Sequence, residues 1–480
     1  MKMRTSTFFV LVITVFSYIL YVSVFDIEYG QNENRIIWLL SVLGIALYIF
    51  VLWTWKQLYG SFYSLYTIFM TFAFAFTYGQ CFMWAIGVHS DSEIGATILY
   101  STKIGIASKH DIICTQIMTL MGLLAFHCGA VLSYKKKSMK LATETQDDDA
   151  HFETDRKNLY LVSKVAALFS FPAAIYNSIK LLIVYRTYGY GANLYNKDVI
   201  SSTNNVVILI SMMFFASLVG LIIGSNYKKR IVIFCYSVFA VYAVICAIGG
   251  DRGEWLYPLV FLVWLHIQHY GKLNIRRFLK YVPVGVLLIV ILSAISNARK
   301  HGVTVESLSS SLSTSGNPIS STFFEMGKQM IIPLIFIQEG WDIYPYGNTY
   351  VFAVLGMVTE RVITGIINPQ YVSVGGWLSQ EYLGIDYGAG FSMIGEALVN
   401  FGPYFCIIAL LFLGMIYSRV MNTQNIDCKK DSIGLFFKVT TAEVIISSIR
   451  NPMITSLKNW FFSTVIMLLA VRIIKSLRKG

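Results

Sequence analysis

Long and almost uncharged apolar runs recur along the whole of this 480-residue chain. A helix of roughly 20 apolar residues spans the hydrocarbon core of a bilayer, and a helix satisfies its own backbone hydrogen bonds there. The runs therefore predict an all-α polytopic membrane protein with about twelve transmembrane helices. Their starts lie near residues 6, 36, 62, 112, 159, 205, 231, 255, 280, 402, 434 and 459.

The composition agrees with a membrane protein and argues against several soluble classes. Hydrophobic residues make up 56% of the chain and charged residues only 13%, about half the charged share of a soluble domain. The net charge of +12 comes from short basic clusters between apolar runs, so we expect no nucleic-acid partner. The seven cysteines show no metal-ligand spacing, and no nucleotide-binding motif occurs. We therefore expect no metal and no cofactor.

The basic clusters predict the topology. Counted from a cytoplasmic N-terminus, they all follow even-numbered helices, as the positive-inside rule requires. Both termini and the segment 135–158, predicted to be a flexible loop, are then cytoplasmic. The clusters are Lys135–Lys140, Lys228–Arg230, Lys272–Lys280, Lys429–Lys430 and Lys475–Lys479.

One connection is much longer than the others. We expect helices one to nine within 1–296, a large external loop over 297–401, and helices ten to twelve within 402–480. The loop contains partly amphipathic stretches over 322–338 and 349–368. Long ordered loops are usually functional, so the chemistry is expected there.

A charged turn joins the predicted seventh and eighth helices. In Gly249–Glu254, Arg252 is flanked by Asp251 and Glu254. The planar fork of an arginine binds a phosphate or carboxylate through two hydrogen bonds. Arg252 is therefore a candidate catalytic residue, with the two acids beside it as candidate substrate contacts. The alternative is that Arg252 pairs with Asp251 or Glu254 and only shapes the turn.

Further basic residues are predicted on the same external side. Arg299, Lys300 and His301 follow the ninth helix, and Arg361 and Arg450 are isolated. Each could simply anchor the chain at the membrane interface. If the arginines converge on one cavity, they form a site for a multiply charged anion, such as a diphosphate, without a metal.

The loop also supplies an acid and several aromatic rings. Glu396 lies in the stretch Gly395–Gly402, which leads straight into the predicted tenth helix, and an ionisable group at that depth is a functional hypothesis. It could instead be a helix-terminal charge or the partner of an arginine. Tyr346 and Tyr350 could stack on sugar rings, although interfacial aromatic belts explain most aromatic residues in such chains.

The order of these features resembles that of the Wzy-type polymerases, which join O-antigen or capsule repeat units. The similarity rests on the number of helices, the Gly-Asp-Arg-Gly turn at 250–253 and the late external loop. Within the loop it rests on Tyr346–Tyr350 and on Gly390–Gly402, which is similar to the family's Gly-x-Ser…Glu…Asn-Phe-Gly pattern and contains Asn400.

The resemblance implies a metal-independent glycosyltransferase with a GT-C-like fold in the bacterial cytoplasmic (inner) membrane. The substrate would be an oligosaccharide on a polyprenyl diphosphate, transferred on the outer face. Arg252, Arg299 and Glu396 or His301 would act in catalysis, and Asn400 would contact the substrate. A chain-length regulator and a flippase are the partners it implies.

Two other functions fit a polytopic chain. An O-antigen ligase shares the general fold and an arginine-rich outer site, but the Gly390–Gly402 element favours a polymerase. A flippase or another transporter also often has about twelve helices. Such proteins place charges within the helices, whereas here the charges crowd at helix ends and in the loop.

Overall fold

The computed structural model describes residues 5–99, 104–135, 146–189, 199, 204–251, 253–271, 317–385 and 387–478, with the backbone alone for 146–150. Regular structure in these ranges is helical. Nine helical segments of the described chain are long and apolar enough to cross a membrane. They are α1 (Thr5–Val24), η1–α2 (Gly30–Asn32 and Glu33–Tyr59), α3 (Leu65–Ala85), α4 (Lys109–Ser133), most of α5 (Gln146–Tyr188), α8–α9 (Asn205–Ser211 and Phe214–Gly224), α10 (Lys229–Ile248), α18 (Met393–Met421) and α20–η7–α21 (Met453–Trp460, Phe461–Val465 and Ile466–Leu477).

These segments confirm the prediction of a multi-pass all-α membrane protein. Two further predicted spans coincide with shorter helices, α11 (Gly253–Tyr270) of 18 residues and α19 (Ser432–Ser447) of 16 residues. The span predicted near residue 280 lies outside the described residues. The count of about twelve and the GT-C-like arrangement stay predictions.

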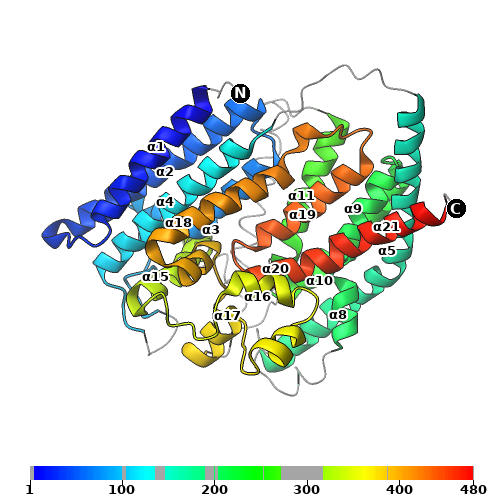
Figure 1. Ribbon diagram of the computed structural model, residues 1–480. Coiled ribbons are helices and arrows are strands. Elements are labelled where there is room, and N and C mark those ends of the chain that lie inside the picture. Colours follow the sequence, from blue (N-terminus) through cyan, green and yellow to red (C-terminus); the bar gives the residue numbers. More distant parts are fainter. Residues whose placement is uncertain are drawn as a thin grey trace. The chain divides into compact units, whose positions relative to one another are not determined.

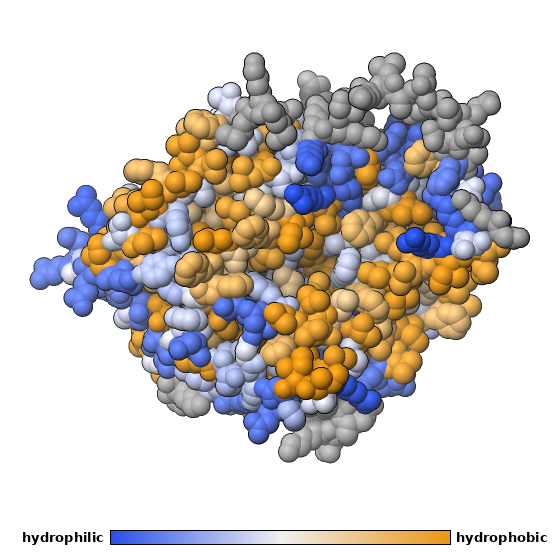
Figure 2. Space-filling view, in the orientation of Figure 1, coloured by the Kyte–Doolittle hydropathy of each residue, from blue (hydrophilic) through white to orange (hydrophobic). Residues whose placement is uncertain are grey.

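The first of two compact units comprises Met1–Lys135, Ser320–Asn422 and Ile445–Leu457. Its central helix is α4, in which 94% of the apolar window is buried. Helix α4 packs against α1, α2 and α18, and Figure 1 shows these helices side by side. By contrast, only 17% of the apolar window of α1 is buried. In Figure 2 the exposed surface of α1 and α2 is mostly hydrophobic, as expected for helices that face lipid.

Glycines let α4 and α18 touch through their backbones. A Cβ atom added at Gly129 would lie 1.9 Å from the carbonyl oxygen of Leu411, and one at Gly414 would lie 2.0 Å from that of Phe126. Small residues allow such close approach between membrane helices. The position of α18 is therefore fixed against the most buried helix of the unit.

The predicted loop 297–401 contains a series of short helices in its described part. They are α14 (Pro318–Gly327), η3 (Lys328–Met330), α15 (Ile331–Glu339), α16 (Thr349–Gly356), η4 (Ile363–Ile367), α17 (Val374–Gly376) and η5 (Trp377–Tyr382). Helix α15 packs against α4 and α18, and Ile331–Phe336 are all buried. The predicted amphipathic character of 322–338 is therefore wrong for α15, because helices cover it on more than one side.

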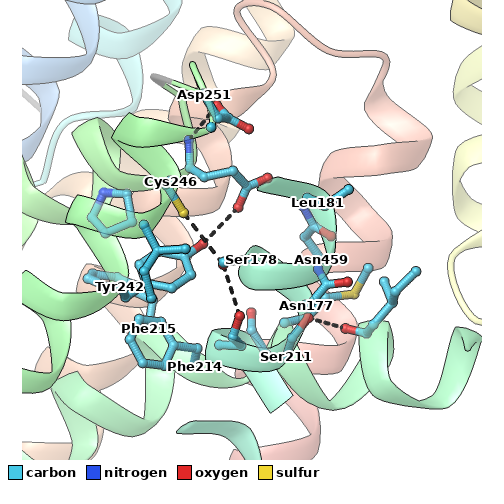
Figure 3. Close-up of a pocket in the computed structure, with 18 of the residues that line it drawn as sticks. Asn177, Ser178, Leu181, Ser211, Phe214, Phe215, Tyr242, Cys246, Asp251 and Asn459 are labelled. Atoms are coloured by element: carbon cyan, nitrogen blue, oxygen red, sulfur yellow. Dashed lines mark hydrogen bonds between the residues drawn. The ribbon is translucent and has the colours of Figure 1, made fainter. Parts of the chain in front are cut away.

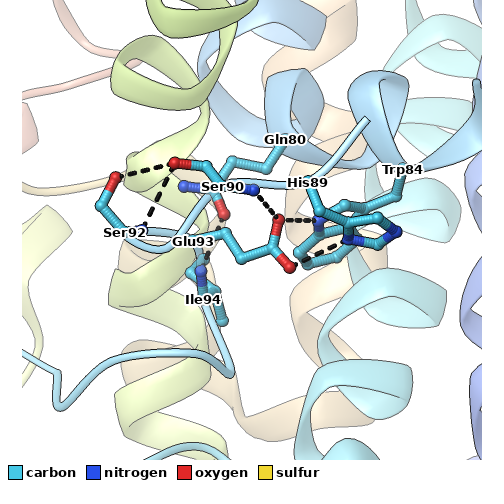
Figure 4. A network of polar contacts seen from close by, with 7 residues as sticks. All are labelled: Gln80, Trp84, His89, Ser90, Ser92, Glu93 and Ile94. Carbon is cyan, nitrogen blue, oxygen red and sulfur yellow. Dashed lines mark hydrogen bonds and ion pairs between the residues drawn. The ribbon is translucent and has the colours of Figure 1, made fainter. Parts of the chain in front are cut away.

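A polar turn after α3 ties this helix to α14 (Figure 4). The Glu93 carboxylate accepts a hydrogen bond of 2.8 Å from Trp84 Nε1. The Gln80 amide oxygen accepts one of 3.0 Å from the Ile94 N–H, and its Nε2 donates one of 3.1 Å to the Phe324 carbonyl. One buried side chain thus joins three segments of the first unit.

The second unit comprises Lys136–Ile319, Thr423–Val444 and Lys458–Gly480. In it α5 packs against α8, α9, α10 and α21. The predicted flexible loop 135–158 is wrong for its second part, because α5 begins at Gln146. An ion pair of 2.7 Å between Lys475 Nζ and Asp155 holds this end of α5 against α21. The first part of the predicted loop, 136–145, lies outside the described residues.

The glycine contact between α4 and α18 gives a testable prediction. Gly129→Ala should lower the free energy of unfolding by about 1–3 kcal/mol, because its methyl group would overlap the Leu411 carbonyl. The thermal midpoint of the detergent-solubilised protein measures this effect. The matched control is Gly365→Ala, since a Cβ there meets nothing within 4 Å. Equal midpoints for the two variants would rule out the close contact.

Candidate active site

Helix α18 begins at Met393, ahead of the predicted start near residue 402, and consists of two helical stretches separated by the non-helical Gly402. The Ser392 hydroxyl caps the helix by accepting a hydrogen bond from the Gly395 N–H. The helix continues through a kink at Gly402, whose φ of 69° suits glycine, followed by Pro403. The second helical stretch thus begins next to the predicted start, and the stretch from Met393 to Gly402 is the part that the sequence assigned to the loop.

The first turns of α18 carry a buried carboxyl group with a complete set of partners. Glu396 is 2% exposed. One of its oxygens accepts a hydrogen bond of 2.7 Å from Thr349 Oγ1, and the other accepts one of 2.8 Å from the Met453 N–H. Asn400 Nδ2 donates to Thr349 Oγ1, and Asn400 Oδ1 accepts from the Thr349 N–H, both at 2.7 Å. We call these four residues the Glu396 network.

The same helix end fixes the turn that carries Arg450. The Phe391 N–H donates a hydrogen bond of 2.8 Å to the Arg450 carbonyl, and Met453 is held by Glu396. The guanidinium carbon of Arg450 lies 5.0 Å from the centre of the Phe76 ring, a cation–π distance. Glu396 thus holds the backbone beside Arg450, and no ion pair between the two is found among the described residues.

Aromatic side chains gather on the short helices of the loop. Tyr346 donates a hydrogen bond of 3.1 Å to Glu381, and Tyr382 donates one of 2.9 Å to Glu339. Burial and then the bond to Glu339 raise the pKa of Tyr382 to about 12. Both phenols are therefore neutral donors at physiological pH. The Tyr382 ring lies 5.1 Å from that of the buried Trp377. The half-buried rings of Tyr346 and Tyr382 are thus each bonded to a carboxylate.

The remaining predicted site residues are distributed differently. Tyr350 lies in the first turn of α16, and its buried hydroxyl has no hydrogen-bond partner in the described part of the chain. Arg361 is exposed just before η4. The other predicted basic residues, which are Arg252, Arg299, Lys300 and His301, lie outside the described residues. The predicted convergence of four arginines therefore stays a prediction.

Asp251 and Glu254 belong to the second unit and line a cavity there (Figure 3). Asp251 Oδ1 accepts a hydrogen bond of 3.0 Å from the Gly253 N–H at the start of α11. Glu254 accepts one of 3.2 Å from the Tyr242 hydroxyl. The cavity has an empty volume of about 1020 Å³.

Comparison with known families decides what kind of protein carries these sites. The profile of the O-antigen polysaccharide polymerase Wzy family matches residues 6–479, essentially the whole chain. The chain belongs to this family. No curated protein and no solved structure matches it. The Wzy polymerases act in polysaccharide synthesis, and their reaction is of the glycosyltransferase type.

The sequence did not single out two residues of these sites, Thr349 and Glu443. Thr349 is the central member of the Glu396 network, and only its place inside Tyr346–Tyr350 marked it. Glu443 lies in α19 and lines the cavity of the second unit. A lone acid within an apolar run is itself a functional signal, so Glu443 could have been found by that rule.

Variants of Glu396 separate a positioning role from proton transfer. Glu396→Ala should lower the thermal midpoint and abolish polymer, because two buried donors lose their acceptor at about 1–3 kcal/mol each. Glu396→Gln keeps an oxygen for the Met453 N–H and should retain most activity. Polymer length on a gel and the thermal midpoint are the measurements. A loss of about 10²-fold or more in Glu396→Gln, at an unchanged midpoint, would assign Glu396 the acid/base role predicted from the sequence.

Proposed function

We propose that this polymerase joins oligosaccharide repeat units carried on a polyprenyl diphosphate, on the outer face of the bacterial cytoplasmic membrane. The observation that carries the proposal is the family match over residues 6–479. The nine apolar spans found in the described part of the chain agree with a lipid-linked substrate. The product is a surface polysaccharide, O-antigen or capsule, and both termini face the cytoplasm. A flippase would deliver the units, and a chain-length regulator would limit their number.

The reaction needs no nucleotide, because the lipid diphosphate is itself the leaving group. A hydroxyl oxygen of the incoming lipid-linked unit attacks C1 of the sugar that links the growing glycan to its carrier. The C1–O bond to phosphate breaks, a glycosidic bond forms, and the polyprenyl diphosphate departs as an anion. The hydroxyl proton passes to a carboxylate or a histidine of the protein. Arginines can stabilise the departing charge, so the proposal includes no metal.

Arginine side chains supply the diphosphate site in this proposal. Arg450 is supported by its geometry, because its backbone is fixed through Phe391 and Met453 while its guanidinium packs on a ring. A preorganised cation avoids reorganisation when charge develops. Arg252, Arg299 and Arg361 are the partners that the sequence suggests.

The structure favours a positioning role for Glu396. Each carboxylate oxygen accepts one hydrogen bond, from Thr349 and from Met453, and these two bonds fix the orientation of the carboxyl group. Its contact with the Met453 N–H fixes the turn that carries Arg450. The acceptor of the hydroxyl proton is then another carboxylate of the protein, or His301.

Deletion of the gene in its host tests the proposed function. A polymerase mutant should show a surface glycan with a single repeat unit on its anchor, and a plasmid copy should restore the ladder on a resolving gel. Lipid-linked polymer that accumulates outside the membrane would identify a ligase. Single lipid-linked units trapped inside would identify a flippase. An unchanged ladder would exclude all three functions.

Arginine variants test the diphosphate site. Arg450→Ala should reduce polymer at least 100-fold, since removal of one charge-stabilising group costs about 2.7–4 kcal/mol, while the protein stays in the membrane at its normal level. Arg450→Lys keeps the charge but loses the planar fork and should recover only part of the activity. The control is Lys56→Ala, on another ring contact at Phe62. Normal polymer from Arg450→Ala would remove Arg450 from the site.

A further inference from the structure

The cavity of the second unit is enclosed by helices that are distant in the sequence. Residues from α5, α8, α9, α10, α11, α19 and α20 line it. The space between them, which opens to solvent, is about 1020 Å³. Figure 3 shows Asn177 and Asn459 on one side of the view and Tyr242 with Phe214 on the other.

Polar groups in the cavity have unused hydrogen-bonding capacity. In the part of the chain that the structure describes, no hydrogen bond is found for the side chains of Asn177, Asn459 or Glu443. Glu254 uses one of its oxygens, for Tyr242, and is exposed. Polar groups at membrane depth need partners. The two amides and the carboxylates therefore suit a ligand rich in both donors and acceptors.

The charge of the lining limits what the ligand can be. Asp251, Glu254 and Glu443 contribute carboxylates, and the described lining contains no lysine, arginine or histidine. The described lining therefore offers a phosphate group no cation to pair with. No three acidic, cysteine or histidine residues of the described chain are placed to hold a metal ion. The acids are thus available as hydrogen-bond acceptors for hydroxyl or amino groups.

Two aromatic rings also line the cavity. The Tyr242 and Phe214 rings pack 4.6 Å apart, and both line the cavity. Flat rings beside amides and carboxylates match the two faces of a sugar, since its C–H groups can pack on a ring while its hydroxyls bond to polar side chains. A lipid tail would leave these polar groups without partners.

We propose that this cavity is a glycan subsite that binds a sugar residue of the repeat unit through its hydroxyl or amino groups and excludes the diphosphate. The inference rests on the proposed function, since the polymerase must hold a sugar next to a diphosphate. Asp251 and Glu254 line the cavity, and in the sequence they flank Arg252, which is a proposed diphosphate ligand. A sugar bound in the cavity would therefore lie close to the proposed diphosphate site. In this proposal the cavity binds the sugar, and the arginines bind the diphosphate.

Binding of a lipid-free repeat unit tests the subsite directly. The full-length protein is placed in nanodiscs, and binding of the delipidated oligosaccharide is measured by titration calorimetry. Asn177→Ala/Asn459→Ala should weaken binding at least tenfold, and Glu443→Gln at least fivefold. Matched controls in the same unit are Glu153→Gln, in a surface ion pair, and Ser170→Ala, bonded to Ser217 outside the cavity. Neither control should change the affinity.

Several outcomes would overturn the subsite. They are absence of binding to the unmodified protein, equal affinities of cavity variants and controls, and displacement of the sugar by inorganic pyrophosphate. Glu443→Gln is nearly isosteric, so it remains informative if the double variant fails to fold. The measurement reports binding and the gel reports joining. Intact sugar binding with an unchanged ladder in the deletion strain would therefore contradict the proposed function alone, and the reverse result would contradict the subsite alone.

Discussion

A carboxyl group buried among apolar helices must find its hydrogen-bond donors within the protein, and this constraint organises the first unit. Glu396 finds them 47 residues away at Thr349 and 57 residues away at Met453. The starts of α16 and α20 are therefore fixed against α18 by one side chain. The position of Arg450 follows from this, although Glu396 and Arg450 form no ion pair in the described structure.

Glu396 can fix the starts of α16 and α20 only if α18 is itself held in place, and its contact with α4 does this. Gly414 and Gly129 bring the backbones of α18 and α4 into contact, and α4 is almost wholly buried. Close-packed helices have low compressibility, so one cannot move far without its neighbour. The Glu396 network lies on the stretch of α18 before the kink at Gly402, and α15 packs against both α4 and α18.

The sequence predicted helices well, because helices that face lipid consist of apolar runs. Glu396 and Asn400 were named as candidates because they stand in a recognisable element, and their roles stay predictions. The sequence missed Thr349 as their partner, since hydrogen bonds across 47 residues leave no local pattern. It found the helical stretch after Gly402 but not the one that begins at Met393, because a Gly-Pro pair can end a helix or bend one. It overlooked Glu443, although an acid within an apolar run carries its own signal.

A lipid diphosphate and the sugar attached to it need opposite surroundings. The anion needs fixed cations, whereas sugar hydroxyls need acceptors that do not compete for the anion. The turn around Arg252 can serve both needs only if its acids have partners other than the arginine. In the described structure Asp251 caps α11 and Glu254 accepts from Tyr242. Both acids thus have roles within the second unit that do not depend on Arg252.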